Sequence, residues 1–157
     1  MLVQAWNCQG VGRPPRIRHL KEVLATYHPS MVFLVETKNK SRKLESIRRR
    51  IGRYGHRFYI DPMGLSGRLA LWWNDAVDVH IIKASPNIIH THCKCQSLNM
   101  DWFSSFVYVD CRDDFRGESW EVLNNLAGKI NSLWFVIEDL NIIRAPKDKE
   151  GGIIPNA

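Results

Sequence analysis

The 157-residue sequence has no run of about 18 apolar residues, the length that a membrane-spanning helix requires. Its first ten residues, MLVQAWNCQG, lack the basic start of a secretory signal peptide and contain only a short apolar run. No internal repeat, low-complexity segment or interdomain linker divides the chain. These absences favour one domain spanning residues 1–157, intracellular or nuclear, with no membrane contact and no obligate protein partner.

Cysteine is scarce, with four residues at irregular spacing, Cys8, Cys93, Cys95 and Cys111. Without a secretory signal, this pattern argues against a disulfide framework. Residues 90–95, HTHCKC, combine two of the cysteines with two histidines, but a zinc site usually draws on two separated pairs of ligands. The alternation within these six residues instead favours a strand that carries polar groups on one face.

Acidic residues are scarce in residues 1–57, which carry 3 Asp and Glu against 13 Lys and Arg. Residues 58–157 carry 13 acidic residues against 9 basic ones. A basic face suits a polyanion, and an acidic cluster suits a divalent cation. The basic stretch 38–53, KNKSRKLESIRRRIGR, is equally well explained as the solvated face of a helix.

The first part of the chain predicts two strands, each followed by a helix. The first strand ends at Asn7, and the second is the apolar run 31–36. Helical spacing of apolar residues predicts helices over 14–28 and 41–52, the latter with Ser41 as N-cap and Gly52 as its stop.

The rest of the chain predicts mostly strands, with one helix. Short turns rich in Gly, Pro, Asn and Asp separate the strand segments, which indicates antiparallel pairing. These strands cover 56–60, 68–73, 77–84, 88–95 and 102–110. A helix over 117–130, with Trp120, Leu123 and Leu126 facing inward, precedes a buried strand over 133–141.

This order of elements predicts an α+β fold, a layered αββα arrangement. The chain ends in a loop directly after a buried strand, so we expect a C-terminal truncation that leaves the second sheet incomplete. The tryptophans Trp72, Trp73 and Trp102 lie in strands, which favours core packing over stacking on nucleic-acid bases.

Polar side chains follow three of the apolar strands. Asn7 follows LVQAW, Glu36 follows MVFLV, and Asp139 and Asn141 follow WFVIE. Active sites of layered α/β proteins gather where strand ends meet loops. Carboxylate and amide oxygens at these ends predict a Mg²⁺ site, since Mg²⁺ takes one or two carboxylates and fills its other positions with water and phosphate oxygens.

The same strand ends belong to four motifs along the chain. These are WNCQG at 6–10, VFLVETK at 32–38, GLSGRLALWW at 64–73 and DLN at 139–141. Together these motifs resemble the endonuclease/exonuclease/phosphatase superfamily, whose fold is the four-layered, DNase I-like αββα sandwich. Within it, the chain is most similar to the endonuclease domain of plant LINE-type (non-LTR) retrotransposons. The resemblance implies a phosphodiesterase that cuts DNA with Mg²⁺ or Mn²⁺.

For the metal, the resemblance implies Glu36 as the main carboxylate ligand, with Asn7 beside it. Gln9 stands where many members have an Asp that joins the metal site, and as a neutral amide it can only assist.

For catalysis, the resemblance implies that Asp139 orients or deprotonates the attacking water. Asn141 would hold that water and the phosphate, and Tyr108 would contact the scissile phosphate. Asn7, Asn141 and Tyr108 are accordingly the expected substrate-binding residues.

Three departures from the family pattern affect the expected activity. Glu138 replaces the Gly of the G-D-F-N motif and adds a charge that repels phosphate, so we interpret it as a defect. Arg68 replaces the second Gly of G-L-S-G-G, which strains the loop if a positive φ is needed there. The C-terminal S-D-H motif, whose His stabilises the phosphate, has no counterpart around any of the six histidines.

Four hypotheses follow. The chain is an active DNA endonuclease of retrotransposon origin, or an inactive truncated relic, which the missing His favours. Alternatively, it is a nucleic-acid-binding module that uses its basic helices, or a phosphatase of small phosphoesters.

Overall fold

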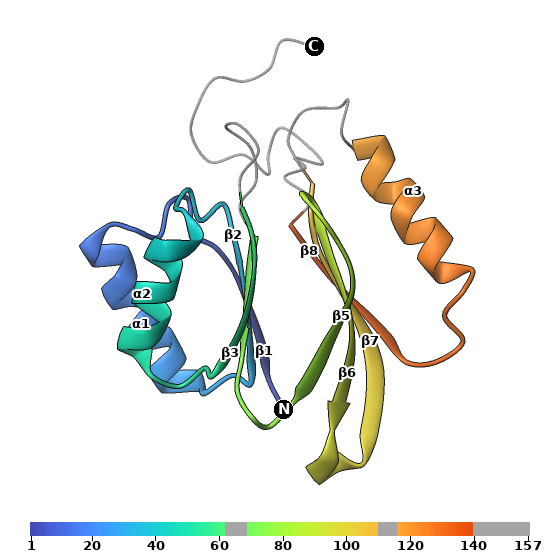
Figure 1. Ribbon diagram of the computed structural model, residues 1–157, viewed down its shortest axis with the longest axis horizontal. Coiled ribbons are helices and arrows are strands. Elements are labelled where there is room, and N and C mark those ends of the chain that lie inside the picture. Colours follow the sequence, from blue (N-terminus) through green and yellow to red (C-terminus); the bar gives the residue numbers. More distant parts are fainter. Residues whose placement is uncertain (62–68, 110–115, 140–157) are drawn as a thin grey trace, which may run out of the picture.

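The computed structural model describes residues 1–61, 69–109 and 116–139, which form two β-sheets flanked by helices (Figure 1). The elements are β1 (Val3–Asn7), α1 (Pro14–Tyr27), β2 (Met31–Val35), α2 (Ser41–Ile51), β3 (His56–Ile60), β4 (Leu69–Trp73), β5 (Asp78–Ser85), β6 (Ile88–Cys95), the 3₁₀ turn η1 (Gln96–Leu98), β7 (Met100–Tyr108), α3 (Arg116–Ala127) and β8 (Trp134–Asp139). None of the described helices has both the length and the apolar character needed to cross a membrane.

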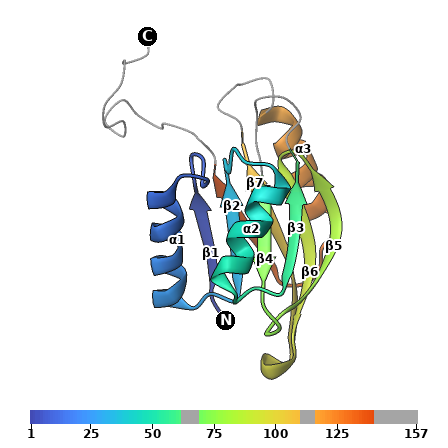
Figure 2. The ribbon, with the colours of Figure 1, turned by 60° about the vertical axis from the view of Figure 1, so that its left-hand side comes forward.

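The elements stack in four layers. The first sheet has the order β1-β2-β4-β3, and the second has the order β5-β6-β7-β8. Helices α1 and α2 cover the outer face of the first sheet, and α3 covers the second (Figures 1 and 2). The predicted αββα sandwich is therefore confirmed. Four strands pair in the second sheet among the described residues, and the expectation of further, missing strands stays a prediction.

Each sheet contains one parallel pair of strands next to antiparallel ones. The pairs β1–β2 and β7–β8 are parallel, and a helix connects the two strands in each case. The other neighbours are antiparallel. For the pairs β3–β4, β5–β6 and β6–β7, this confirms the pairing that the short turns predicted. Parallel neighbours end at the same edge of their sheet, so the chain brings two strand ends together in each sheet.

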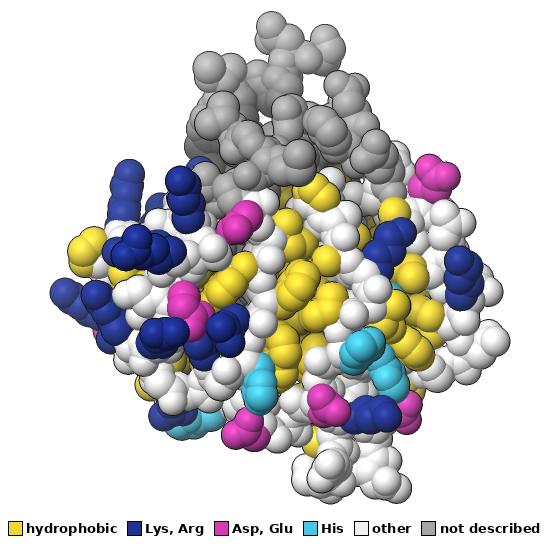
Figure 3. All heavy atoms as spheres, in the orientation of Figure 1, with side chains coloured by type: hydrophobic (Ala, Val, Ile, Leu, Met, Phe, Trp, Pro, Cys, Tyr) yellow, Lys and Arg dark blue, Asp and Glu magenta, His cyan; other side chains and the backbone are white. Residues whose placement is uncertain are grey.

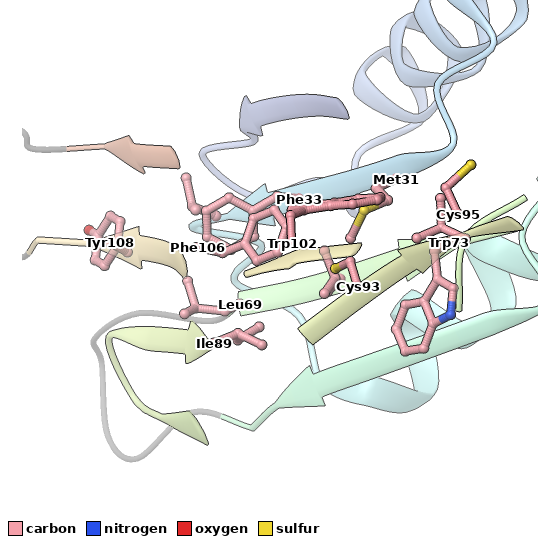
Figure 4. Close-up of a cluster of buried hydrophobic side chains, with 13 residues drawn as sticks. Met31, Phe33, Leu69, Trp73, Ile89, Cys93, Cys95, Trp102, Phe106 and Tyr108 are labelled. Carbon is pink, nitrogen blue, oxygen red and sulfur yellow. The ribbon is translucent and has the colours of Figure 1, made fainter. Parts of the chain in front are cut away.

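An apolar layer fills the space between the sheets (Figure 4). Phe33 of the first sheet packs on Phe106 of the second, with ring centroids 5.1 Å apart. Trp73 and Trp102 belong to this layer, whereas Trp72 lies in the cluster beneath α1 and α2. All three tryptophans are buried, which confirms that they are core residues.

The start of α2 differs from the prediction. Lys40, rather than Ser41, is the N-cap residue, and it makes no side-chain capping bond. Ser41 is the first helical residue, and its backbone N–H donates to Oδ1 of Asp61 at 3.3 Å. A carboxylate that is distant in the sequence thus satisfies the helix terminus, which local pattern cannot reveal. The predicted stop at Gly52 is confirmed, with φ of 74°.

The inward face of α3 also differs from the prediction. Trp120 is 45% exposed, although Leu123 is buried and Leu126 is partly buried against β7 and β8. The buried stripe contains Ser119 and Val122 together with these leucines, and this i, i+3, i+4, i+7 spacing leaves Trp120 beside it.

Strand β8 is not fully buried, contrary to the prediction. Phe135 is 49% exposed, and Val136 and Leu133 are also exposed. The reason is position, because β8 ends the order of the second sheet and pairs only with β7 among the described strands.

The HTHCKC segment forms β6, which confirms the predicted strand. The imidazole of His90 is buried and lies 2.8 Å from the Ser105 hydroxyl, and burial lowers the pKa of His90. Cys93 and Cys95 point into the layer between the sheets. The alternation therefore separates the histidines from the cysteines, because successive side chains of a strand face opposite sides.

One partly exposed carboxylate, that of Glu45, links α2 to the edge of the first sheet. Glu45 accepts hydrogen bonds from Arg48 at 2.6 Å, Arg49 at 3.0 Å and the Tyr59 hydroxyl at 2.9 Å, and it pairs with Arg57 at 3.3 Å. These hydrogen bonds, that of Arg48 first, lower the pKa of Glu45 to about 2.

We predict that Glu45→Gln lowers the free energy of unfolding at pH 7 by about 2 kcal/mol, since the buried guanidinium of Arg48 loses its charged partner. Because folding depresses the pKa of Glu45, its stabilisation is complete above the unfolded value of 4.5 and is lost as the pH falls towards about 2. Denaturant titrations should therefore show the free energies of unfolding of the wild type and Glu45→Gln converging as the pH falls over this range. Glu121→Gln on the exposed face of α3 is the control, and a pH-independent difference for Glu45→Gln would contradict the prediction.

Candidate active site

The predicted site residues lie where the strand ends of the two sheets meet. In the first sheet, Asn7 pairs with Val35 at the ends of β1 and β2, so Glu36 follows directly beside Asn7. In the second sheet, Tyr108 pairs with Asp139 at the ends of β7 and β8. Parallel pairing in both sheets is what aligns these four strand ends.

Side-chain hydrogen bonds join the two sheets at this edge. Nδ2 of Asn7 donates to Oε1 of Glu36 at 3.2 Å and to Oδ2 of Asp139 at 2.7 Å. The hydroxyl of Tyr108 donates to the same Oε1 of Glu36 at 3.1 Å. The structure therefore brings together Asn7, Glu36, Tyr108 and Asp139, of which two come from each sheet.

The amide of Asn7 has a defined orientation. Its Oδ1 accepts the backbone N–H of Gln9 at 3.1 Å, while its nitrogen faces the two carboxylates. The side chain of Gln9 is exposed, and the backbone is the part of this residue that contacts Asn7. Asn7 thus acts as a bridge between carboxylates here.

The loops that carry these side chains have unusual backbone conformations. Gln9, Glu36 and Lys38 have φ of 43°, 50° and 51°, in the left-handed region that non-glycine residues rarely adopt. Backbone bonds hold the loops together, from Gly10 N–H to Glu36 O at 2.8 Å and from Val11 N–H to Thr37 O at 3.1 Å. Strained backbone of this kind concentrates at functional sites, where surrounding contacts maintain it.

Arg16 is a supporting residue that the sequence did not reveal. From the first turn of α1, its Nη1 donates to the carbonyl oxygens of Cys8 at 2.6 Å and Gly10 at 3.3 Å, and also to that of Gln9. One guanidinium therefore ties down three successive carbonyls directly after Asn7. Nothing in the sequence distinguishes Arg16 from the other basic residues of the region.

The donor set fits a divalent cation that takes few protein ligands. Among the described residues, no three His, Cys, Asp or Glu side chains form a metal-binding group. Mg²⁺, however, needs only one or two carboxylates. The described hydrogen bonds to the Glu36 carboxylate come from neutral donors, Asn7 and Tyr108, while Asp139 shares the amide of Asn7. Two converging carboxylates repel each other, and a cation between them would offset that repulsion.

Cys8 lies beside these groups but is a poor nucleophile. Burial raises the pKa of its thiol to about 12, with a smaller opposing effect from Arg16. The thiolate is the reactive form, so Cys8 is a packing residue of the cluster beneath the helices.

Two of the sequence predictions fall on residues outside the described part of the chain, Asn141 and Arg68. Glu138 is described, and it is exposed on the face of β8 opposite to Asp139. Its carboxylate therefore points away from the two that converge, and its interpretation as a defect stays a prediction.

The model of the Endonuclease/Exonuclease/phosphatase family matches residues 5–146 of this chain. No curated protein matches its sequence. Among solved structures, a humanized D. rerio TDP2 carrying 14 mutations is 16% identical, with a TM-score of 0.67 over 90% of this chain and 62% of that one. The human Nocturnin catalytic domain with bound sulfate is 13% identical, with a TM-score of 0.66 over 90% and 64%.

The endonuclease domain of TRAS1, a telomere-specific non-LTR retrotransposon, is also similar, at 11% identity and a TM-score of 0.60 over 88% of this chain and 58% of that one. At these identities the likeness concerns the fold. The chain spans less than two thirds of the length of each of these three structures.

We predict that Arg16→Met loosens the loop after β1. Hydrogen exchange at the amides of Cys8, Gly10 and Val11 should accelerate about tenfold, because the three carbonyl bonds of Arg16 are lost. Arg18→Met, at an exposed position of the same helix, should leave these amides unchanged. Unaltered hydrogen exchange at these amides in Arg16→Met would contradict the prediction, because the loop would then keep its conformation without the Arg16 side chain.

Proposed function

Because the chain belongs to the endonuclease/exonuclease/phosphatase family, we propose that it is a divalent-metal-dependent phosphodiesterase that cuts DNA. Its origin would be a LINE-type retrotransposon, of the plant kind that its motifs resemble. The observation that carries the proposal is the convergence of Glu36 and Asp139, from different sheets, on the amide of Asn7.

Two of the similar structures support DNA as the substrate. One is D. rerio TDP2 in complex with a single-strand DNA product, at 15% identity, a TM-score of 0.67, and coverage of 90% of this chain and 60% of that one. The other is the retrotransposon endonuclease domain of TRAS1. For this chain, DNA cleavage remains a proposal.

The residues proposed to hold the cation are Glu36, as the charged ligand, and Asn7 and Gln9 as neutral assistants. A bound Mg²⁺ or Mn²⁺ supplies positive charge that offsets the charge developing on the phosphate. The bond from Tyr108 keeps the Glu36 carboxylate in place, and the Asn7 amide keeps Asp139 next to it. Such prior positioning lowers the cost of reaching the transition state.

The residues proposed to act on the substrate are Asp139, Asn141 and Tyr108. Asp139 is a carboxylate at the end of a strand, and it would orient or deprotonate the attacking water. Asn141 would hold that water and the phosphate. The Tyr108 hydroxyl and the Asn7 amide would donate to a non-bridging oxygen after releasing the carboxylates to which they donate in this structure. Neutral donors suit this task because they stabilise the phosphate without repelling it.

A second candidate function is DNA binding without cleavage. The described contacts engage five of the six histidines with Trp6, Arg53, Asp75, Ser105 and Asp101, outside the candidate site. In the described contacts, none of these five histidines reaches the candidate site, where one would assist the phosphate. This favours the second function. Hydrolysis of small phosphoesters is the third possibility that the assay must separate.

We predict that the chain nicks supercoiled plasmid DNA in Mg²⁺ and not in EDTA. Glu36→Gln and Asp139→Asn should each lower the rate about 100-fold or more, since each removes a carboxylate from the site. Glu121→Gln, exposed on α3, is the matched control and should retain the wild-type rate.

Nicking that survives in both site variants would identify a contaminating nuclease and refute the proposal. Binding of DNA in EDTA with no nicking in Mg²⁺ would establish the second candidate. Hydrolysis of p-nitrophenyl phosphate without nicking would establish the third.

A further inference from the structure

We infer that the outer face of α2 and the loop before it bind the backbone of duplex DNA beyond the cleavage site. This surface, which we name the α2 surface, consists of Lys38, Lys40, Arg42, Lys43, Ser46, Arg49 and Arg50. The inference rests on the proposed function for the identity of its ligand. It adds a second contact region that the candidate site does not contain.

Two shallow, open hollows lie on the α2 surface. One hollow of ≈ 580 Å³ is lined by Lys38, Asn39, Lys40, Arg42, Lys43 and Ser46. A second, of ≈ 530 Å³, is lined by Arg42, Glu45, Ser46, Arg49 and Arg50. Arg42 and Ser46 line both, so the two hollows adjoin along the helix.

The positive charge of this surface is largely uncompensated. In the described part of the chain, none of Lys38, Lys40, Arg42, Lys43 and Arg50 forms an ion pair. Among the described residues that line the hollows, Glu45 is the one acidic side chain. Its carboxylate already accepts from Arg48 and Arg49 and pairs with Arg57.

Burial explains why these charges lie on one side. Leu44 and Ile47 are buried against the first sheet, while Arg42, Lys43 and Arg49 are exposed. Figure 3 shows Lys and Arg side chains gathered over the region of α1 and α2. A solvated helix commonly alternates acidic and basic residues. The charged residues of α2 are instead five basic ones and one acidic one, which favours a polyanion as its ligand.

The α2 surface is continuous with the candidate site. Lys38 lies two residues after Glu36. Its side chain packs over Gly10, since a Cβ added at Gly10 would lie 3.7 Å from Lys38 Cδ. From there the surface follows α2, which has 11 residues and is therefore about 16 Å long. That length matches about five phosphates of one DNA strand, at about 3.4 Å each.

The experiment measures DNA binding in EDTA, so that cleavage cannot consume the probe. The variants are Arg42→Gln/Lys43→Gln on α2 and, as the matched control, Arg18→Gln/Lys21→Gln at exposed positions on α1. Both pairs remove two positive charges and keep long polar side chains. Fluorescence anisotropy with a short labelled duplex, titrated at salt concentrations from about 50 to 200 mM, gives the dependence of log K on log salt.

We expect the α2 pair to weaken binding for every duplex sequence and to reduce the salt slope by about 2, because two phosphate contacts are lost. The α1 pair should change the slope little. An unchanged slope for the α2 pair, or an equal change for both pairs, would overturn the inference.

Nicking by the wild-type chain tests the proposed function separately. If nicking fails while the α2 pair alone reduces the salt slope, the α2 surface stands and the cleavage proposal falls. Circular dichroism of both variants excludes unfolding as the cause of any loss.

Discussion

The amide of Asn7 is the contact on which the candidate site depends. It donates to Glu36 in its own sheet and to Asp139 in the other, so one side chain sets the separation of two carboxylates carried by different layers. Its orientation is set in turn by the Gln9 backbone, whose left-handed conformation Arg16 helps to maintain. A small displacement in the loop after β1 would therefore alter both the amide and the distance between the acids.

The apolar layer between the sheets keeps the two sheets, and therefore the residues of this contact, in a fixed relative position. Phe33 and Phe106 lie next to each other across the layer and fix how closely the sheets approach. Interiors pack at the density of organic crystals, so that a change in volume at such a position is transmitted rather than absorbed. Phe33 is three residues before Glu36, and Phe106 is two before Tyr108, so the core and the site share the same two strands.

Much of the fold was predictable from the sequence because the strands are short and strongly apolar. Met31–Val35 is buried along its whole length, and its pattern alone identified it as a strand. The prediction was wrong where tertiary contacts decide the outcome. The carboxylate of Asp61, distant in the sequence, accepts the backbone N–H at the start of α2. On α3, the buried stripe of residues runs beside Trp120 and leaves it exposed.

The candidate site was predictable in part, since Asn7, Glu36, Tyr108 and Asp139 were expected together and the structure brings them together. The expectation came from four short motifs in order, because no single strand end is distinctive. Arg16 was missed because its role depends on where three backbone carbonyls point, and the identity of a side chain carries no such information.

The bond between Asn7 and Asp139 spans 132 residues of sequence, which has a consequence for how the protein forms. A contact of such separation closes a very long loop, and its entropic cost must be met before the contact can contribute stability. During synthesis, β8 is the last of the described strands to be made. The carboxylates of Glu36 and Asp139 can therefore face each other only after β8 has been made, and a chain that ends before β8 lacks this contact.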